Sequence, residues 1–252
     1  MDWKLSKSIY IFVFLIINIV LIIVLYNQNK TSDSMEIKTN KTVQKSDDYK
    51  TNVNTTEEIK LTVLNGTRKE FQSATSSEES TNQGMLKSIR KVQSLDFEPS
   101  HVKEYVDQEM YKGSEYTYNS DTSNKEILYF NQMHNSLPIF NNSAARIKAV
   151  NKDEGIQLEQ GYIENISANE YSKKESVNDP LEAVEELMKE KEISKEAIIL
   201  SSTLGYYLVL LHDNSNQVLL RPKWKLIIEE KDITRVIYVD AINASEEIIE
   251  GE

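Results

Sequence analysis

Apolar positions follow three different patterns along the chain. Residues 9–26, IYIFVFLIINIVLIIVLY, form an unbroken apolar run of 18 residues with one polar member, Asn18. At a rise of about 1.5 Å per residue this run spans about 27 Å, close to the thickness of a bilayer's hydrocarbon core. The pattern predicts a transmembrane helix over residues 9–26 behind a short head, residues 1–8.

The same run has a second interpretation, a cleaved secretory signal. It is longer than the apolar region of a typical signal peptide, and no small-residue cleavage site follows it. We therefore expect an uncleaved signal anchor. Lys4 and Lys7 favour a cytoplasmic N-terminus. This predicts a single-pass protein of the cell membrane whose bulk lies outside.

Residues 27–56 are polar, with only scattered apolar positions, which predicts a flexible stalk. Residues 58–64 alternate between polar and apolar and predict a first strand. Residues 85–95 carry Leu86, Ile89 and Val92 at helical spacing and predict a short helix.

Two later blocks repeat one order of elements, a helix followed by strands. In the first, a helix over 101–110 precedes strands at 115–118, 126–133, 137–140, 145–150 and 155–163. In the second, a helix over 180–191 precedes strands at 204–212, 217–229 and 234–242. The predicted fold class is α+β, with an extracytoplasmic ectodomain of antiparallel sheets and packed helices. The block order predicts two similar units, residues 57–165 and 166–252.

Composition narrows the possible partners. The chain has 29 Lys and Arg against 40 Asp and Glu, a formal net charge of −11. Nucleic acid and anionic lipid surfaces both need basic patches, so we expect no nucleic acid and contact with membrane lipid only through the anchor. The chain has no Cys, which excludes disulfides, thiol catalysis and thiolate metal sites.

Motifs for catalysis are absent from the sequence. The three His residues fall on different predicted elements, and there is no HExxH, GxSxG or glycine-rich phosphate loop. We therefore predict no catalytic residue, no cofactor and no metal site, and we do not expect an enzyme.

Two features are candidates for contact with partners. A mid-membrane Asn such as Asn18 can hydrogen-bond across helices, although single anchors also tolerate one Asn. A set of aromatic and proline residues in the last strands could line a surface groove for a ligand; its members are Tyr206, Tyr207, Pro222, Trp224 and Tyr238. Alternating aromatics in a sheet also commonly form the core and cross-strand pairs.

Motifs in a fixed order give the chain a family resemblance. The head MDWKLSKSIYIFVFLIIN resembles the start of the YycI (WalI) family, and further motifs of that family follow. These motifs involve Tyr111, Gly113, Glu115 and Tyr116, the hairpin over 128–131 and 137–140, the strand over 159–162, Leu204-Gly205-Tyr206-Tyr207, Gln217-Val218-Leu219 with Pro222 and Trp224, and the final strand over 238–242.

This resemblance implies a function. The YycI family consists of auxiliary membrane proteins of the WalK–WalR (YycG–YycF) two-component system, which controls cell-wall homeostasis in Gram-positive bacteria. Its members pair with the sister protein YycH (WalH) and contact the WalK sensor histidine kinase, and they have no known active site. Two alternatives remain open from the residues: a ligand-sensing ectodomain around Trp224, and an anchored cell-wall enzyme with paired carboxylates.

Overall fold

The structure is a computed structural model that describes residues 14, 18, 43–54, 58–71, 88–140, 143–211, 216–243 and 248–251. The chain divides into two compact units, Met1–Thr42 and Val43–Glu252. The transmembrane helix predicted over residues 9–26 lies outside the described residues, apart from Phe14 and Asn18. In the described part, no helix has the length and apolar character needed to cross a membrane.

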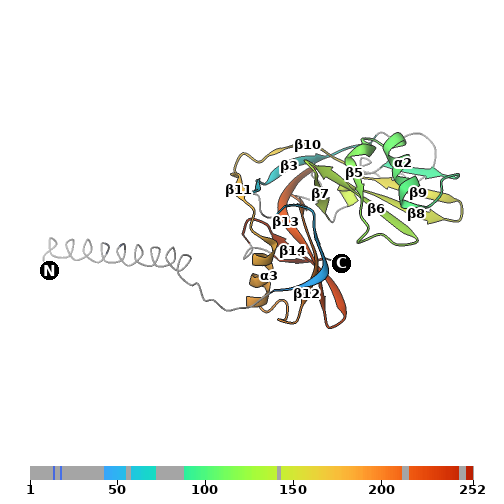
Figure 1. Cartoon of the computed structure of the whole chain (residues 1–252). Helices are drawn as coiled ribbons and strands as arrows, with labels where there is room; N and C mark the ends of the chain where they lie inside the picture. The colour runs from blue at the N-terminus through green and yellow to red at the C-terminus, as the bar shows by residue number, and fades with distance from the viewer. Residues whose placement is uncertain are drawn as a thin grey trace, which may run out of the picture. The chain divides into compact units, whose positions relative to one another are not determined.

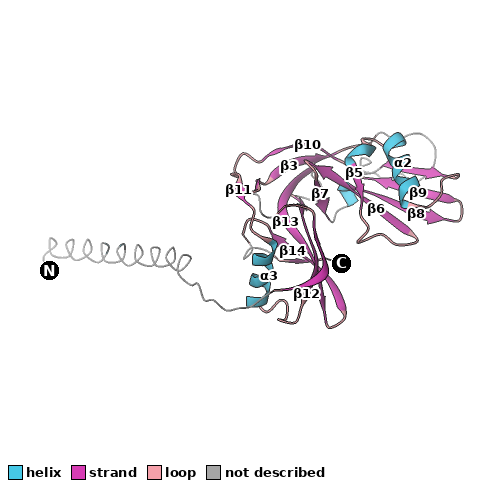
Figure 2. Ribbon diagram, viewed as in Figure 1, coloured by secondary structure: helices cyan, strands magenta, loops and turns pink. Residues whose placement is uncertain are grey.

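Strands dominate the second unit (Figures 1 and 2). The described strands are β1 (Gln44–Thr51), β2 (Lys60–Leu61), β3 (Leu64–Arg68), β4 (Ser88–Val92), β5 (Tyr116–Tyr118), β6 (Ile127–His134), β7 (Leu137–Phe140), β8 (Arg146–Lys152), β9 (Gly155–Gln160), β10 (Ile163–Ala168), β11 (Glu175–Ser176), β12 (Ile198–Leu210), β13 (Gln217–Glu230), β14 (Ile233–Asp240) and β15 (Ile249–Glu250). The described α-helices are α2 (Pro99–Glu109) and α3 (Pro180–Lys189).

Most strand pairs are antiparallel, as expected, but the large sheet is mixed. Its strand order is β10-β3-β13-β12-β7-β6-β8-β9-β4, with β1 on β12, β5 on β6, and β14 and β15 beyond β13. β1 and β7 each pair with β12 in parallel. β12 and β13, the longest strands, form the hairpin at the centre of this arrangement.

Two hydrophobic cores form, and each is covered by one helix (Figure 1). In the α2 lobe, which consists of α2, β4, β5, β6, β8 and β9, alternating strand residues such as Phe130, Ile147 and Leu158 meet Val102 and Val106 of the helix. The strand period of two places these apolar side chains on one face, and the helix supplies the matching stripe.

The α3 lobe consists of α3 with β1, β3, β7, β10 and β12–β15. Asp179 begins the helix, because its side chain accepts a hydrogen bond from the Leu181 amide at 2.8 Å and Pro180 occupies the first turn. Val184 and Leu187, fully buried on the inner side of α3, join the core formed by β12, β13 and β14.

The short helix predicted over residues 85–95 is wrong, because residues 88–92 form the edge strand β4. Ile89, which the prediction placed on the apolar stripe, has 63 % of its surface exposed. Apolar residues three apart in so short a segment are compatible with a helix or a strand, and pairing with β9 decides for the strand.

Two boundaries of the predicted domains also differ from the structure. Residues 44–51, inside the predicted stalk of residues 27–56, form β1 and pair with β12. The boundary predicted between 57–165 and 166–252 does not separate the cores, because β3 and β7 belong to the same core as β12 and β13. The partners of β3 on β13 lie about 150 residues away and those of β7 on β12 lie 67 residues away, and local periodicity carries no information about either.

Candidate functional site

Asn18 is one of the two described residues of the first unit, and it is helical. Its side-chain Nδ2 donates a hydrogen bond to the Phe14 carbonyl oxygen, one turn earlier, at 2.7 Å. This bond uses one of the two N–H groups of the amide, so the other N–H and the carbonyl oxygen are the groups that a partner helix would meet. The membrane contact of Asn18 stays a prediction.

The predicted aromatic surface is wrong, because its members are divided between the two faces of the β12–β13–β14 sheet. On the face toward α3, Tyr206 pairs with Pro222, and Trp224 pairs with Leu204. Trp224 is 1 % exposed, and its indole N–H donates to the Asn178 carbonyl oxygen at 3.0 Å. Trp224 therefore belongs to the core, where it holds the segment that leads into α3.

Tyr207 and Tyr238 occupy the opposite face of these strands. Their ring centroids are 5.1 Å apart, and Phe140 stacks on Tyr238 at 5.5 Å. Burial raises the pKa of Tyr238 to about 12. Because β13 lies between β12 and β14, these are ring contacts within one face of the sheet rather than pairs of directly opposed residues.

A row of basic residues on β13 shares this second face and was missed by sequence reasoning. Lys223 and Lys225 are 0 % and 4 % exposed, and Arg221 precedes them at the same alternation. Lys225 Nζ lies 2.7 Å from Asp121 Oδ2, which comes from the segment between β5 and β6. This ion pair joins the α2 lobe to the α3 lobe. A sequence Arg-Pro-Lys-Trp-Lys predicts a solvated outer face, and only the tertiary structure shows that the face is covered.

Two side chains attach β1 to the central strand. The Tyr49 hydroxyl lies 2.6 Å from the hydroxyl of Ser202, a residue with no exposed surface, and burial raises the pKa of Tyr49. The Asn52 side chain accepts from the Leu204 amide at 2.7 Å and donates to the Leu204 carbonyl at 2.9 Å. Because β1 is the first described strand after the predicted anchor, these residues join the segment that follows the anchor to β12.

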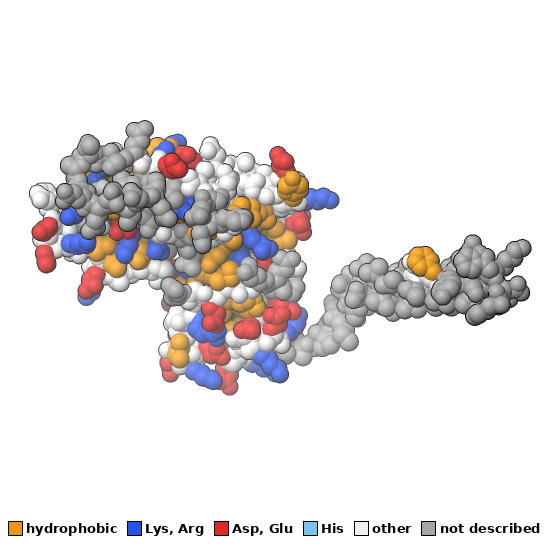
Figure 3. All heavy atoms as spheres, turned by 180° about the vertical axis from the view of Figure 1, so that it is seen from behind, with side chains coloured by type: hydrophobic (Ala, Val, Ile, Leu, Met, Phe, Trp, Pro, Cys, Tyr) orange, Lys and Arg blue, Asp and Glu red, His pale blue; other side chains and the backbone are white. Residues whose placement is uncertain are grey.

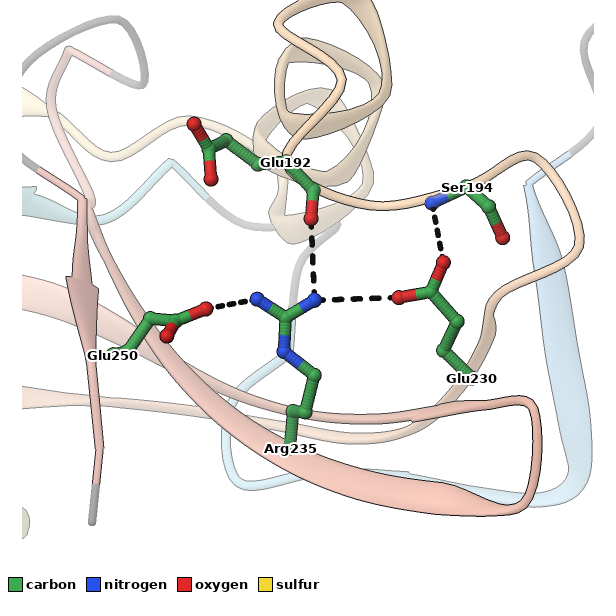
Figure 4. A network of polar contacts seen from close by, with 5 residues as sticks. All are labelled: Glu192, Ser194, Glu230, Arg235 and Glu250. Carbon is green, nitrogen blue, oxygen red and sulfur yellow. Dashed lines mark hydrogen bonds and ion pairs between the residues drawn. The ribbon is translucent and has the colours of Figure 1, made fainter.

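The C-terminal strand is held by a charged network around Arg235 (Figure 4). One Arg235 nitrogen contacts the Glu250 carboxylate of β15, and the other lies 3.2 Å from both Glu230 Oε2 and the Glu192 carbonyl oxygen. Glu230 also accepts from the Ser194 amide at 2.9 Å, and hydrogen bonding by Ser194 and then by Arg235 lowers the pKa of Glu230. The network therefore ties β15, β14 and the turn after α3 together.

The histidines do not converge on a metal site in the described part of the chain. His101 lies 3.1 Å from the Asp96 carboxylate, and His134 packs edge-on to Tyr206 with ring centroids 6.1 Å apart. His212 lies outside the described residues. No cluster of three or more His, Cys, Asp or Glu side chains within the described ranges is arranged to hold a metal ion.

Comparison with known proteins gives one family match. The family model described as "YycI protein" matches residues 21–242. No curated protein matches the sequence. A crystal structure of an uncharacterized protein from Eubacterium rectale ATCC 33656 is similar with a TM-score of 0.36 and 12 % identity, over 61 % of this chain. The match covers 55 % of that protein, so this chain spans about half its length.

Proposed function

The chain belongs to the YycI family, and from this premise we propose that it is an accessory protein that regulates the WalK–WalR two-component system of cell-wall homeostasis. It binds the WalK sensor kinase together with YycH and has no catalytic activity of its own. The observation that carries the proposal is the family match over residues 21–242, which covers most of the chain. The match begins at residue 21, inside the predicted anchor, so it includes part of the anchor as well as the outer unit.

The proposed location follows from the apolar run. The anchor at residues 9–26 spans the cell membrane with its N-terminus in the cytoplasm, and the unit Val43–Glu252 lies outside. Lipid contact is confined to the anchor.

The proposed mechanism is a shift of the kinase between two states. A partner changes such an equilibrium only by its difference in affinity for the two states, and a difference of about 1–3 kcal/mol changes the ratio of states about 5–150-fold. The anchor, including Asn18, supplies one contact with the kinase, and the outer unit supplies another. The bonds of Tyr49 and Asn52 support this arrangement, because they fasten the strand that follows the anchor to the central hairpin.

The ligand-sensing alternative was based on a groove around Trp224, and the structure does not support that site. A ligand groove around Trp224 requires an accessible indole, and this indole is buried and hydrogen-bonded to Asn178. No described observation favours the alternative of a cell-wall enzyme, so neither alternative is proposed.

Affinity purification tests the proposal. The full-length protein with a C-terminal tag is solubilised in mild detergent from cells that express it at its native level. We expect recovery of WalK and YycH. The matched control carries an unrelated apolar anchor in front of an unrelated outer domain. Recovery of neither WalK nor YycH above this control contradicts the proposal.

A further inference from the structure

The sheet of the α2 lobe has one covered face and one open face. Leu128, Phe130, Ile147, Ala149 and Leu158 are buried on the face toward α2. The residues between them point to the opposite face, and all of these are half-buried or exposed. No described helix lies on this second face (Figure 2).

The strands of the open face carry more cations than carboxylates, in a chain that is strongly negative. Its strand residues with a charge are Lys91 of β4, Arg146, Lys148 and Lys152 of β8, and Glu159 of β9. The chain as a whole has a formal net charge of −11. Two further carboxylates, Asp153 and Glu154, lie in the turn at the end of the β8–β9 hairpin. The four cations therefore outnumber the one carboxylate on the strands themselves.

Apolar side chains lie between these cations. Strand register places Tyr129, Lys148, Glu159 and Ile89 in one row across β6, β8, β9 and β4. The next row contains Ile127, Val150, Gln157 and Lys91. Figure 3 shows blue Lys and Arg side chains beside orange hydrophobic ones, with red Asp and Glu among them, along the lower surface of this lobe.

The surface of the open face is uneven, with an oriented Arg146 side chain and two hollows. The Arg146 guanidinium carbon lies 4.5 Å from the centre of the Tyr129 ring, which orients the side chain across the strands. One hollow, of about 250 Å³, is lined by Lys91, Lys152, Asp153, Glu154, Gly155 and Gln157. The other, of about 100 Å³, is lined by Ser143, Arg146, Lys148 and Glu159.

We propose that this basic and apolar face of the β6–β8–β9–β4 sheet, named the open face, is the docking surface for an acidic protein surface on the YycH ectodomain. The inference rests on the proposed function, and it adds the location and the chemistry of the contact. Cations on a broadly negative protein select an acidic partner, because the remaining surface repels it. The partner presents carboxylates to Lys91 and Lys148, and apolar side chains to Ile89 and Tyr129.

The mixture of side chains favours a protein over other anionic partners. An anionic polymer or lipid surface is bound best by contiguous cations, whereas here Ile89, Tyr129 and Val150 separate the cations and Glu159 lies among them. Protein interfaces combine an apolar centre with charged residues around it. Ile89 has 63 % of its surface exposed, so its burial contributes more binding free energy than burial of the other apolar residues of this face.

The experiment measures binding of purified full-length YycH to the full-length chain in the same detergent, at 50 and at 300 mM salt. The test variant is Lys91→Glu with Lys148→Glu. The control variant, Lys173→Glu with Lys174→Glu, reverses two charges in the exposed loop before β11. Thermal unfolding of all proteins verifies that the variants are folded. A third variant, Ile89→Ser, removes the apolar contact without changing charge.

We expect the Kd of the test variant to rise about tenfold or more and its dependence on salt to weaken. We expect Ile89→Ser to weaken binding at both salt concentrations and the control to stay within about twofold of the parent chain. Unchanged affinity of the test variant overturns the inference and leaves the proposed function standing. A parent chain that does not bind YycH overturns the inference, and it overturns the proposed function as well if the affinity purification recovers neither YycH nor WalK. Binding of the open face to phosphatidylglycerol vesicles, with YycH affinity unaffected by the charge reversals, also overturns the inference.

Discussion

Replacing Asn52 by Leu is expected to loosen β1 from the sheet. The Asn52 side chain makes two hydrogen bonds to the backbone of Leu204, at 2.7 and 2.9 Å. A protein hydrogen bond contributes about 0.5–1.5 kcal/mol net, and Asn52 is partly solvated, so we expect a total loss of about 1–2 kcal/mol. Leu has a similar volume and cannot donate or accept, so the change removes the bonds and leaves most of the bulk.

Hydrogen exchange of the full-length protein measures this effect where it occurs. A loss of about 1–2 kcal/mol in local opening free energy accelerates exchange about 5–30-fold, and we expect this acceleration in peptides that cover Gln44–Thr51. Peptides that cover β8 of the α2 lobe should be unaffected. Asp47→Leu is the control, because Asp47 is an exposed residue of β1, the strand that Asn52 directly follows. Equal exchange in parent and Asn52→Leu proteins, or equal acceleration across all strands, would refute the assignment of Asn52 as the fastening of β1.

Three further outcomes follow from buried contacts, and each is measured by urea unfolding of the full-length protein. Trp224→Phe should lower the unfolding free energy by about 1 kcal/mol, because the indole hydrogen bond is lost. The affinity for YycH should stay constant, and a loss of affinity would indicate that Trp224 belongs to a binding surface. Gly205→Ala should cost about 1–3 kcal/mol, because its methyl group would meet the Pro138 carbonyl oxygen and lie 2.5 Å from two ring carbons of Phe140; equal stability would contradict this close approach of β7 and β12. Tyr238 has a pKa of about 12 in the folded protein against 10.0 ordinarily, so between pH 10 and 12 the unfolded chain loses the proton first and the unfolding free energy falls as the pH rises. Tyr238→Phe should make this fall shallower, and an unchanged dependence of the unfolding free energy on pH would contradict the raised pKa of Tyr238.

Local chemistry allowed the prediction of elements whose signals lie within a few residues. Asp179 and Pro180 mark the start of α3, and the structure begins the helix at Pro180 with Asp179 as its cap. The strand predicted over 137–140 is β7 with the same bounds. A turn precedes it, and all four of its residues are buried. Both signals act on the backbone next to them, so tertiary context does not change them.

Elements that depend on distant partners were not predictable in the same way. β1 is polar, and its pairing depends on Tyr49 and Asn52 meeting residues of β12 that lie about 150 positions away. The aromatic set was compatible with either a surface groove or the core, because alternation alone does not say which face of a strand is covered. Lys225 is a second example. Its position in the strand does not indicate that the segment carrying Asp121 lies over it.

The open face illustrates what register adds to a sequence. Ile89, Lys148 and Tyr129 are far apart along the chain, and only the pairing of β4, β9, β8 and β6 brings them into one row. The sequence indicated a negative protein without basic patches. The local excess of cations on one face emerges because three of the four alternate positions of β8, Arg146, Lys148 and Lys152, are basic and point the same way.

The central claim is that this chain regulates WalK through its anchor and its outer unit. The most direct measurement is the level of phosphorylated WalR in cells that carry the native chain, no chain, or the chain with residues 9–26 replaced by an unrelated anchor of equal length. We predict that loss of the chain changes phosphorylated WalR several-fold and that the swapped anchor reproduces part of that change. An equal level of phosphorylated WalR in all three strains would contradict the claim.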